Sequence, residues 1–185
     1  MLPEFAPQLL ARGAEGGYSR VVLGVHYPLD VIGGRMVGTA AAADRLNDPR
    51  MRANLDAAAQ EVRAELEWRC GDTLANCAQK QAEEGKGYNP AAVERYTELM
   101  NYSFSPILSE SAPMVVPQAA PALLLGKYPH LSHAQRAEVL RQTAGPAGYP
   151  LDKQGAEGSW QRLNLAKALA AKVNVVDDGS VEVVG

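Results

Sequence analysis

A permanent cation, an imidazole and a carboxylate fall within eleven residues of this chain, at Arg20, His26 and Asp30. An imidazole is a competent nucleophile near neutral pH when its attacking nitrogen is unprotonated and correctly aimed. A carboxylate on the opposite ring nitrogen fixes that tautomer and stabilises the cation that develops. An arginine supplies planar donors that match the oxygens of an anion. These residue types and spacings predict a site that binds an oxyanion and attacks it.

A helix that begins at Pro28 would position these groups. Proline is tolerated at the first helical position, where the backbone N–H has no helical partner. His26 would then lie just before the helix N-terminus, whose unpaired N–H groups and dipole favour a bound anion. Asp30 would lie in the first turn, four residues after the histidine and within reach of its ring. We expect this helix to run to about Leu46.

Length and composition restrict the class of protein. The 185 residues suffice for one domain with a core, over residues 1–185. The net charge of −3 gives no general electrostatic footprint for nucleic acid, so we expect no nucleic-acid partner. No apolar run approaches the roughly 20 residues that a membrane helix needs. Residues 1–7 lack the basic start of a signal peptide.

Hydrophobic periodicity and capping signals elsewhere predict an all-α fold with a small terminal hairpin. A short helix over residues 2–12 should be followed by a glycine-rich turn over residues 13–17. Further helices are expected over residues 49–66, 73–84, 89–102, 122–127, 132–143 and 160–172. The predicted starts are Asp48-Pro49, Asn89-Pro90 and the capping box Ser132-His133-Ala134-Gln135. Proline-broken residues 103–121 and glycine-rich residues 145–158 should be loops, and the alternating tail 173–185 allows a hairpin.

Cys70 and Cys77 are the only cysteines. On one unbroken helix their Cα atoms would lie about 10 Å apart, too far for a disulfide. Gly71 and Asp72 could break the helix and bring them together, so a disulfide and two free thiols both remain open. A zinc site is disfavoured because no histidine lies nearby. A disulfide would favour an exported protein.

One stretch also resembles a known family. The pattern Ser19-Arg20-x-x-x-Gly24-x-His26-x-x-x-Asp30 resembles the third signature motif of the phosphatidic acid phosphatase type 2 and vanadium haloperoxidase superfamily. More narrowly, residues 17–35 and the later Trp160-Gln161-Arg162-Leu163-Asn164-Leu165 are similar to bacterial class A non-specific acid phosphatases. The resemblance implies a helical bundle of that type, a periplasmic or secreted location, and a phosphate or small phosphomonoester as ligand. It implies no metal or other cofactor.

The resemblance also implies roles for individual residues. His26 would attack phosphorus and become a phosphohistidine, and Asp30 would hold its other ring nitrogen. Arg20 would bind phosphate oxygens, and Ser19 could offer a hydroxyl or backbone donor to the same anion. Arg12, Glu15 and Arg35 are interpreted as structural ion-pairing residues first and as active-site residues second. His130 and His133 are interpreted as solvated or capping residues.

The departure from the family pattern lowers the expected activity. Family members carry two earlier motifs, one with a phosphate-binding lysine and arginine, and a Pro-Ser-Gly-His whose histidine is the general acid. Neither occurs here, and His26 is the first histidine. We therefore expect the N-terminally truncated, C-terminal part of such a domain, with little or no phosphatase activity alone. Its exposed apolar surface should be covered by a second copy, as a homodimer, or by the missing segment.

Two alternatives stay open. A vanadium-dependent haloperoxidase would hold vanadate as its cofactor in the same pocket, although the flank Val25-His26-Tyr27-Pro28-Leu29-Asp30 is more typical of the phosphatases. The other alternative is a non-catalytic fragment that oligomerises and binds anions weakly at Arg20. A lipid-phosphate phosphatase is disfavoured, because those enzymes span the membrane.

Overall fold

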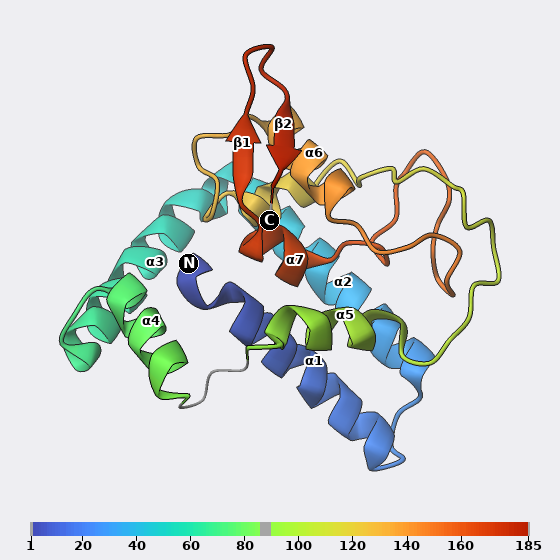
Figure 1. Cartoon of the computed structure of the whole chain (residues 1–185), viewed down its shortest axis with the longest axis horizontal. Helices are drawn as coiled ribbons and strands as arrows, with labels where there is room; N and C mark the ends of the chain where they lie inside the picture. Colours follow the sequence, from blue (N-terminus) through green and yellow to red (C-terminus); the bar gives the residue numbers. More distant parts are fainter. Residues whose placement is uncertain (1, 86–89, 185) are drawn as a thin grey trace.

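The computed structural model describes residues 2–85 and 90–184. They form a mostly helical fold with one small antiparallel sheet near the C-terminus, as the sequence predicts (Figure 1). In chain order the elements are η1 (Pro3–Phe5), α1 (Ala6–Val22), α2 (Pro28–Asn47), α3 (Pro49–Cys70), α4 (Leu74–Glu84), α5 (Ala92–Asn101), η2 (Ala120–Leu124), α6 (His133–Gln142), α7 (Leu165–Ala170), β1 (Val173–Val175) and β2 (Val181–Val183). None of the helices in the described ranges is long and apolar enough to cross a membrane.

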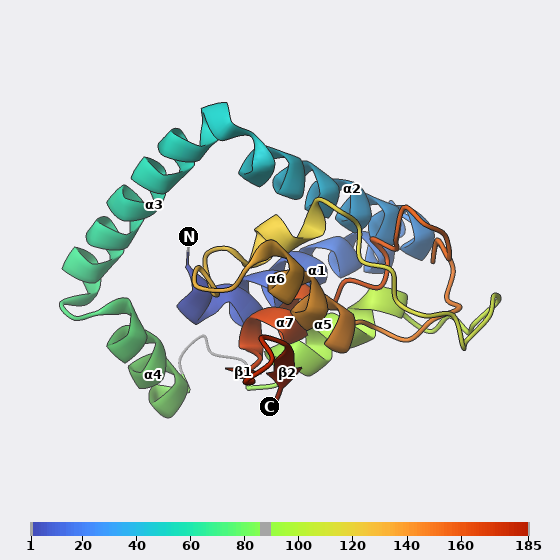
Figure 2. The same ribbon diagram turned by 90° about the horizontal axis from the view of Figure 1, so that it is seen from above.

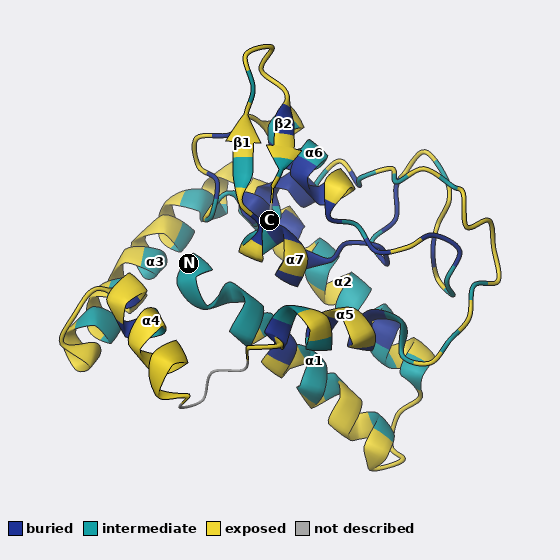
Figure 3. Cartoon of the chain, in the orientation of Figure 1, coloured by how far each residue is buried: buried dark blue, intermediate teal, exposed yellow. Residues whose placement is uncertain are grey.

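The best-packed part of the molecule lies where η2, α6, α7 and the hairpin meet. Buried residues concentrate there, while the far ends of α1 and α2 and most of α3 are exposed (Figure 3). The buried apolar cluster comprises Ala120, Leu124, Tyr128, Leu131, Val139, Leu140, Leu163, Leu165, Ala168 and Val181. α1 joins this body through contacts with α5 and α7, and α2 does so through η2.

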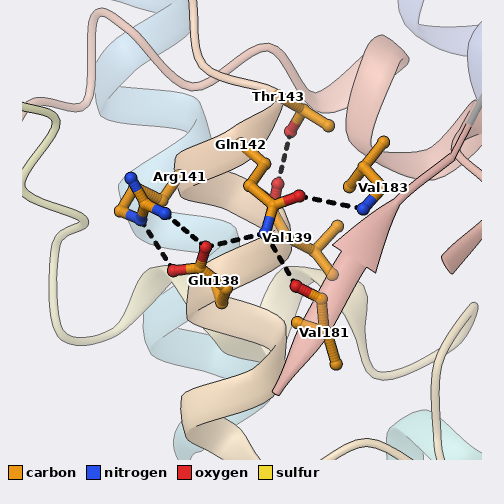
Figure 4. A network of polar contacts seen from close by, with 7 residues as sticks. All are labelled: Glu138, Val139, Arg141, Gln142, Thr143, Val181 and Val183. Carbon is orange, nitrogen blue, oxygen red and sulfur yellow. Dashed lines mark hydrogen bonds and ion pairs between the residues drawn. The ribbon is translucent and has the colours of Figure 1, made fainter. Parts of the chain in front are cut away.

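Two glutamine side chains of α6 bond the hairpin, and Figure 4 shows one of them, Gln142. The Gln135 Nε2 donates to the Gly179 carbonyl in the hairpin turn, at 2.9 Å. Strands β1 and β2 pair in register Val173↔Val183 and Val175↔Val181. The Gln142 Nε2 donates to the Val181 carbonyl at 2.7 Å, and its Oε1 accepts from the Val183 N–H at 2.8 Å. This amide therefore pairs with β2 as a neighbouring strand would, on the edge that β1 leaves open.

α3 and α4 form an arm at one side of the molecule (Figure 2). α3 follows α2 after Asp48, whose side chain accepts from the Arg50 N–H at 2.9 Å and confirms the predicted cap. Gly71 ends α3 in the left-handed conformation, with φ of 78°. The chain then reverses, so the Cα atoms of Cys70 and Cys77 lie 6.5 Å apart and the two cysteines form a disulfide.

The predicted glycine-rich turn over residues 13–17 is wrong, and the helix predicted over residues 2–12 extends to Val22. α1 runs unbroken from Ala6 through the glycines to Val22. A Cβ atom at Gly17 would lie 2.7 Å from Cγ1 of Val31 on α2. This glycine therefore permits the close approach of two helices and does not mark a turn. The turn comes at Gly24, with φ of 71°.

The last predicted helix is shorter than expected. α7 begins at Leu165, because the Asn164 side chain accepts from the Lys167 N–H at 3.0 Å and caps the helix there. Residues 160–163 lie in a loop whose Gln161 and Arg162 are buried. The helix also ends two residues early, at Ala170, and the chain continues into β1.

Three further helix predictions differ in their outcome. The capping box at Ser132 and Gln135 is confirmed, with both of its hydrogen bonds present. The short helix expected over residues 122–127 is a 3-10 helix over Ala120–Leu124. α5 begins at Ala92, and its predicted cap, Asn89, lies outside the described residues.

Candidate functional site

The loop between α1 and α2 brings Arg20 and His26 together. After α1 ends, the backbone N–H groups of Val25 and His26 both donate to the Arg20 carbonyl, at 3.1 and 3.2 Å. Tyr27 is extended, and Pro28 then opens α2 at its first position, as predicted. Gly24 supplies the positive φ that this reversal requires. The loop therefore folds back on the end of α1 and places the imidazole at the N-terminus of α2.

His26 and Asp30 are hydrogen-bonded to each other. The distance from His26 Nδ1 to Asp30 Oδ2 is 3.0 Å, and both side chains are about half exposed. An ionised carboxylate only accepts, so Nδ1 must carry the proton in this contact. The Nε2 of the neutral ring then carries the lone pair. The arrangement can present Nε2 as a nucleophile and offset the positive charge that forms when it reacts.

A cavity of about 460 Å³ adjoins this pair. It lies between α1, α2 and α5, and its charged and aromatic lining is Arg20, His26, Asp30, Arg35, Tyr96 and Tyr102. Gly13, Gly17 and Gly34 form part of its wall, so small residues leave room between the helices. Two arginines and a helix N-terminus make the cavity suitable for an anion.

The structure does not bring Ser19 into this cavity. Its hydroxyl donates to the Gly16 carbonyl at 2.7 Å, one turn back along α1, and it is absent from the lining. The Ser19 hydroxyl is therefore bonded within its own helix, and its contact with an anion stays a prediction. Arg12 and Glu15 pair with each other at 3.0 Å, in line with their interpretation as structural residues.

Arg35 lines the cavity, so its first interpretation, as a structural ion-pairing residue, is wrong and its second, near the site, describes its place better. It lies one turn after Val31 on the face of α2 that approaches Gly17. Its Nη2 donates to the Gln161 carbonyl at 3.1 Å, and it forms no ion pair with any described residue. The helical spacing Val31–Arg35 could have placed it in the site, but only once the contact at Gly17 was known.

Sequence reasoning missed Tyr102. It follows α5 with φ of 51°, a backbone conformation that tyrosine rarely adopts. Burial raises the pKa of its phenol, with nearby Tyr18 and Asp30 acting in the same direction and Arg35 opposing. Its ring lies 6.0 Å from that of Tyr18. Nothing in the local sequence marks a tyrosine for positive φ, so only the structure reveals its place.

Large apolar side chains surround the loop that carries His26. Tyr27 is 82% exposed and Leu23 is 67% exposed. Val22, Val25 and Leu29 are exposed as well. We call these five residues the apolar rim. Exposed large apolar side chains that gather on one loop are typical of an interaction surface.

No known protein-family model matches this chain, and no solved structure matches it. The resemblance to acid phosphatases therefore rests on the sequence alone.

Proposed function

We propose that this site is the nucleophile part of an acid phosphatase-like phosphomonoester hydrolase that acts through a phosphohistidine at His26. One observation supports the proposal most strongly. His26 Nδ1 bonds Asp30 at 3.0 Å, which leaves Nε2 for attack beside a cavity that Arg20 also lines. The N-terminus of α2 adds a favourable potential for the phosphate.

The proposed reaction has two displacements. Nε2 of His26 forms a bond to phosphorus while the phosphorus–oxygen bond to the alcohol breaks, and the leaving oxygen takes a proton from solvent. Water then attacks phosphorus, the phosphorus–nitrogen bond breaks, and inorganic phosphate leaves with the surplus proton passing to solvent. Asp30 stabilises the ring cation in both steps, and Arg20 stabilises the charge on the transferring oxygens.

Turnover by this chain should be slow. His26 is the only histidine in the cavity lining that the structure describes, so no imidazole protonates the leaving group. Loss of a general acid typically costs about 10²- to 10⁴-fold in rate. The family's earlier lysine and arginine motif is also absent from this sequence.

The test compares two leaving groups. An excellent leaving group such as p-nitrophenolate needs little protonation, so p-nitrophenyl phosphate should still phosphorylate His26, whereas an alkyl phosphate should not react detectably. Quenching in alkali preserves a phosphohistidine for mass spectrometry. We expect a label on His26 that His26→Ala abolishes and that His133→Ala, on the exposed start of α6, retains. Ordinary enzyme rates with both substrates, or no label with either, would contradict the proposal.

We also propose a periplasmic or secreted setting. The Cys70–Cys77 disulfide supports it, because such bonds persist in oxidising compartments. Fractionation of the native host, with the disulfide measured by thiol labelling, tests this. Recovery of the protein in the reducing cytosol with both thiols free would contradict it.

A further inference from the structure

Arg35 carries a polar atom that the protein leaves unsatisfied. Its Nε is buried and has no hydrogen-bond partner among the described residues. The other end of the guanidinium is fixed, because Nη2 donates to the Gln161 carbonyl. The Oε1 atom of Gln161 is buried and unpaired as well. Two unsatisfied groups therefore lie on residues that contact each other across α2 and the loop before α7.

An unpaired buried donor on a cationic group is costly, because its hydration is lost without replacement. Proteins rarely leave such a donor unpaired unless water or a ligand completes it. A carboxylate is the usual partner of a guanidinium, but no described carboxylate lies within ion-pair distance of Arg35. Asp30, the carboxylate in the same lining, already accepts from His26. The Gln161 Oε1 is unpaired but does not accept from Nε in this arrangement. No described residue therefore supplies an acceptor for Arg35 Nε.

The position of Arg35 indicates what that acceptor is. Arg35 lines the same cavity as Arg20 and His26. Arg20 comes from the last turn of α1 and Arg35 from the second turn of α2, so the two cations approach the cavity from different helices. An oxyanion with several oxygens can accept from both at once.

We infer that Arg35 is a second oxyanion-binding residue of the site, which receives an oxygen of the phosphate that His26 attacks. This inference rests on the proposed function. A bound phosphate joins α1 to α2 through the two guanidinium groups, in addition to the close contact at Gly17. The same residue binds the oxyanion of substrate, of inorganic phosphate or of vanadate, because each presents several negatively charged oxygens around one central atom.

The test measures inorganic phosphate binding by isothermal calorimetry in four proteins: the unmodified chain, Arg35→Met, Arg35→Lys and Arg45→Met. Arg45 is a matched control, because it lies in the last turn of the same helix, is exposed and lines none of the cavity. A hydrogen-bonded charge pair is worth about a tenfold to hundredfold change in affinity. Arg35→Met should raise the Kd for phosphate by about that factor, and Arg35→Lys by less, because lysine keeps the charge but lacks the fork.

The outcomes separate the two proposals. If the unmodified chain binds phosphate and Arg35→Met binds it equally well, the inference is overturned while the proposed function stands. If Arg45→Met weakens binding as much as Arg35→Met, general charge explains the effect and the inference is again wrong. If the unmodified chain does not bind phosphate, both proposals fail. Melting temperatures without phosphate establish folding, and if Arg35→Met does not fold, a phosphate affinity of Arg35→Lys equal to that of the unmodified chain overturns the inference.

Discussion

Two arginines in different regions of the molecule differ in how completely the protein pairs their hydrogen-bond donors. Arg136, on α6, is buried and donates to the carbonyls of Pro121, Tyr128 and Leu131. Arg35, on α2, has one carbonyl partner and a buried Nε with none in the described chain. Both guanidinium groups are held by backbone carbonyls, but only Arg35 has a buried nitrogen without a partner among the described residues.

The surrounding regions differ in the same way. The body formed by η2, α6, α7 and the hairpin buries its apolar side chains and pairs its polar ones, as the Gln142 amide shows (Figure 4). The junction of α1 and α2 exposes its apolar rim and leaves the buried Arg35 Nε unpaired among the described residues. A region that completes its own contacts acts as scaffold. A region that does not complete them is where a ligand or partner is expected.

The largest expected effect comes from side-chain packing, compared between the body and the apolar rim. Leu140, in the body, is 1% exposed, so Leu140→Ala should lower the free energy of unfolding by about 2–5 kcal/mol. Leu23→Ala, in the apolar rim, should lower the free energy of unfolding by less than about 0.5 kcal/mol. Urea unfolding followed by circular dichroism measures both. Equal losses would show that the rim is part of the core.

The second prediction substitutes the two arginines. Arg136→Met leaves three buried carbonyls without their donor and should cost about 2–4 kcal/mol of unfolding free energy. Arg35→Met removes one hydrogen bond together with an unpaired buried donor, so its net cost without phosphate should stay within about 1 kcal/mol. Chemical denaturation in phosphate-free buffer provides the comparison. A larger loss at Arg35 than at Arg136 would reverse the assignment of scaffold and site.

The third prediction concerns pH. Burial raises the pKa of Tyr128 from 10.0 to about 12, and its hydroxyl contacts the carbonyls of Ala168 and Ala171. Below pH 10 the phenol is neutral in both states, so its contribution is fully present. As pH rises from about 10 to about 12 the unfolded chain ionises first, and stability is lost.

Tyr128→Phe is the matched variant for that measurement. It should cost about 1 kcal/mol at neutral pH, through the lost hydrogen bonds, and should flatten the alkaline decline of the unfolding free energy. Denaturant midpoints collected at intervals across the alkaline range provide the readout. An equally steep decline in both proteins would show that other groups control it.

The smallest change in protomer stability is expected at the rim, where we propose that a second copy of the chain docks. Light scattering should give twice the 19.7 kDa of one chain, and Leu23→Asp together with Val25→Asp should give a monomer. Because both side chains are exposed, the free energy of unfolding of that monomer should change by no more than about 0.5 kcal/mol. A monomeric unmodified protein would contradict the dimer.

Features of the fold that depend on local chemistry could be predicted from the sequence. The caps at Asp48 and Ser132 follow from side chains that bond a nearby N–H, and the His26–Asp30 contact follows from a separation of four residues. Gly17 was misinterpreted because the sequence shows a flexible residue but not the neighbouring Val31 that needs the space.

Tertiary contacts account for what the sequence did not reveal. Residues 160–163 have helical composition, yet distant contacts hold them in a loop. The buried Arg162 donates to the carbonyls of Gly145 and Ala112, and the buried Gln161 donates to the Asn101 side chain. Arg35 and Tyr102 enter the cavity from α2 and from the end of α5, which no pattern within either segment relates to the other.

The disulfide at the tip of the α3–α4 arm has a consequence for proteolysis. The peptide between Cys70 and Cys77 is exposed at Gly71, Asp72 and Thr73, where a protease has access. A single cut there would leave the two pieces of the chain covalently joined. The nicked protein would run at full mass on a gel without reductant and divide into two fragments when reductant is added.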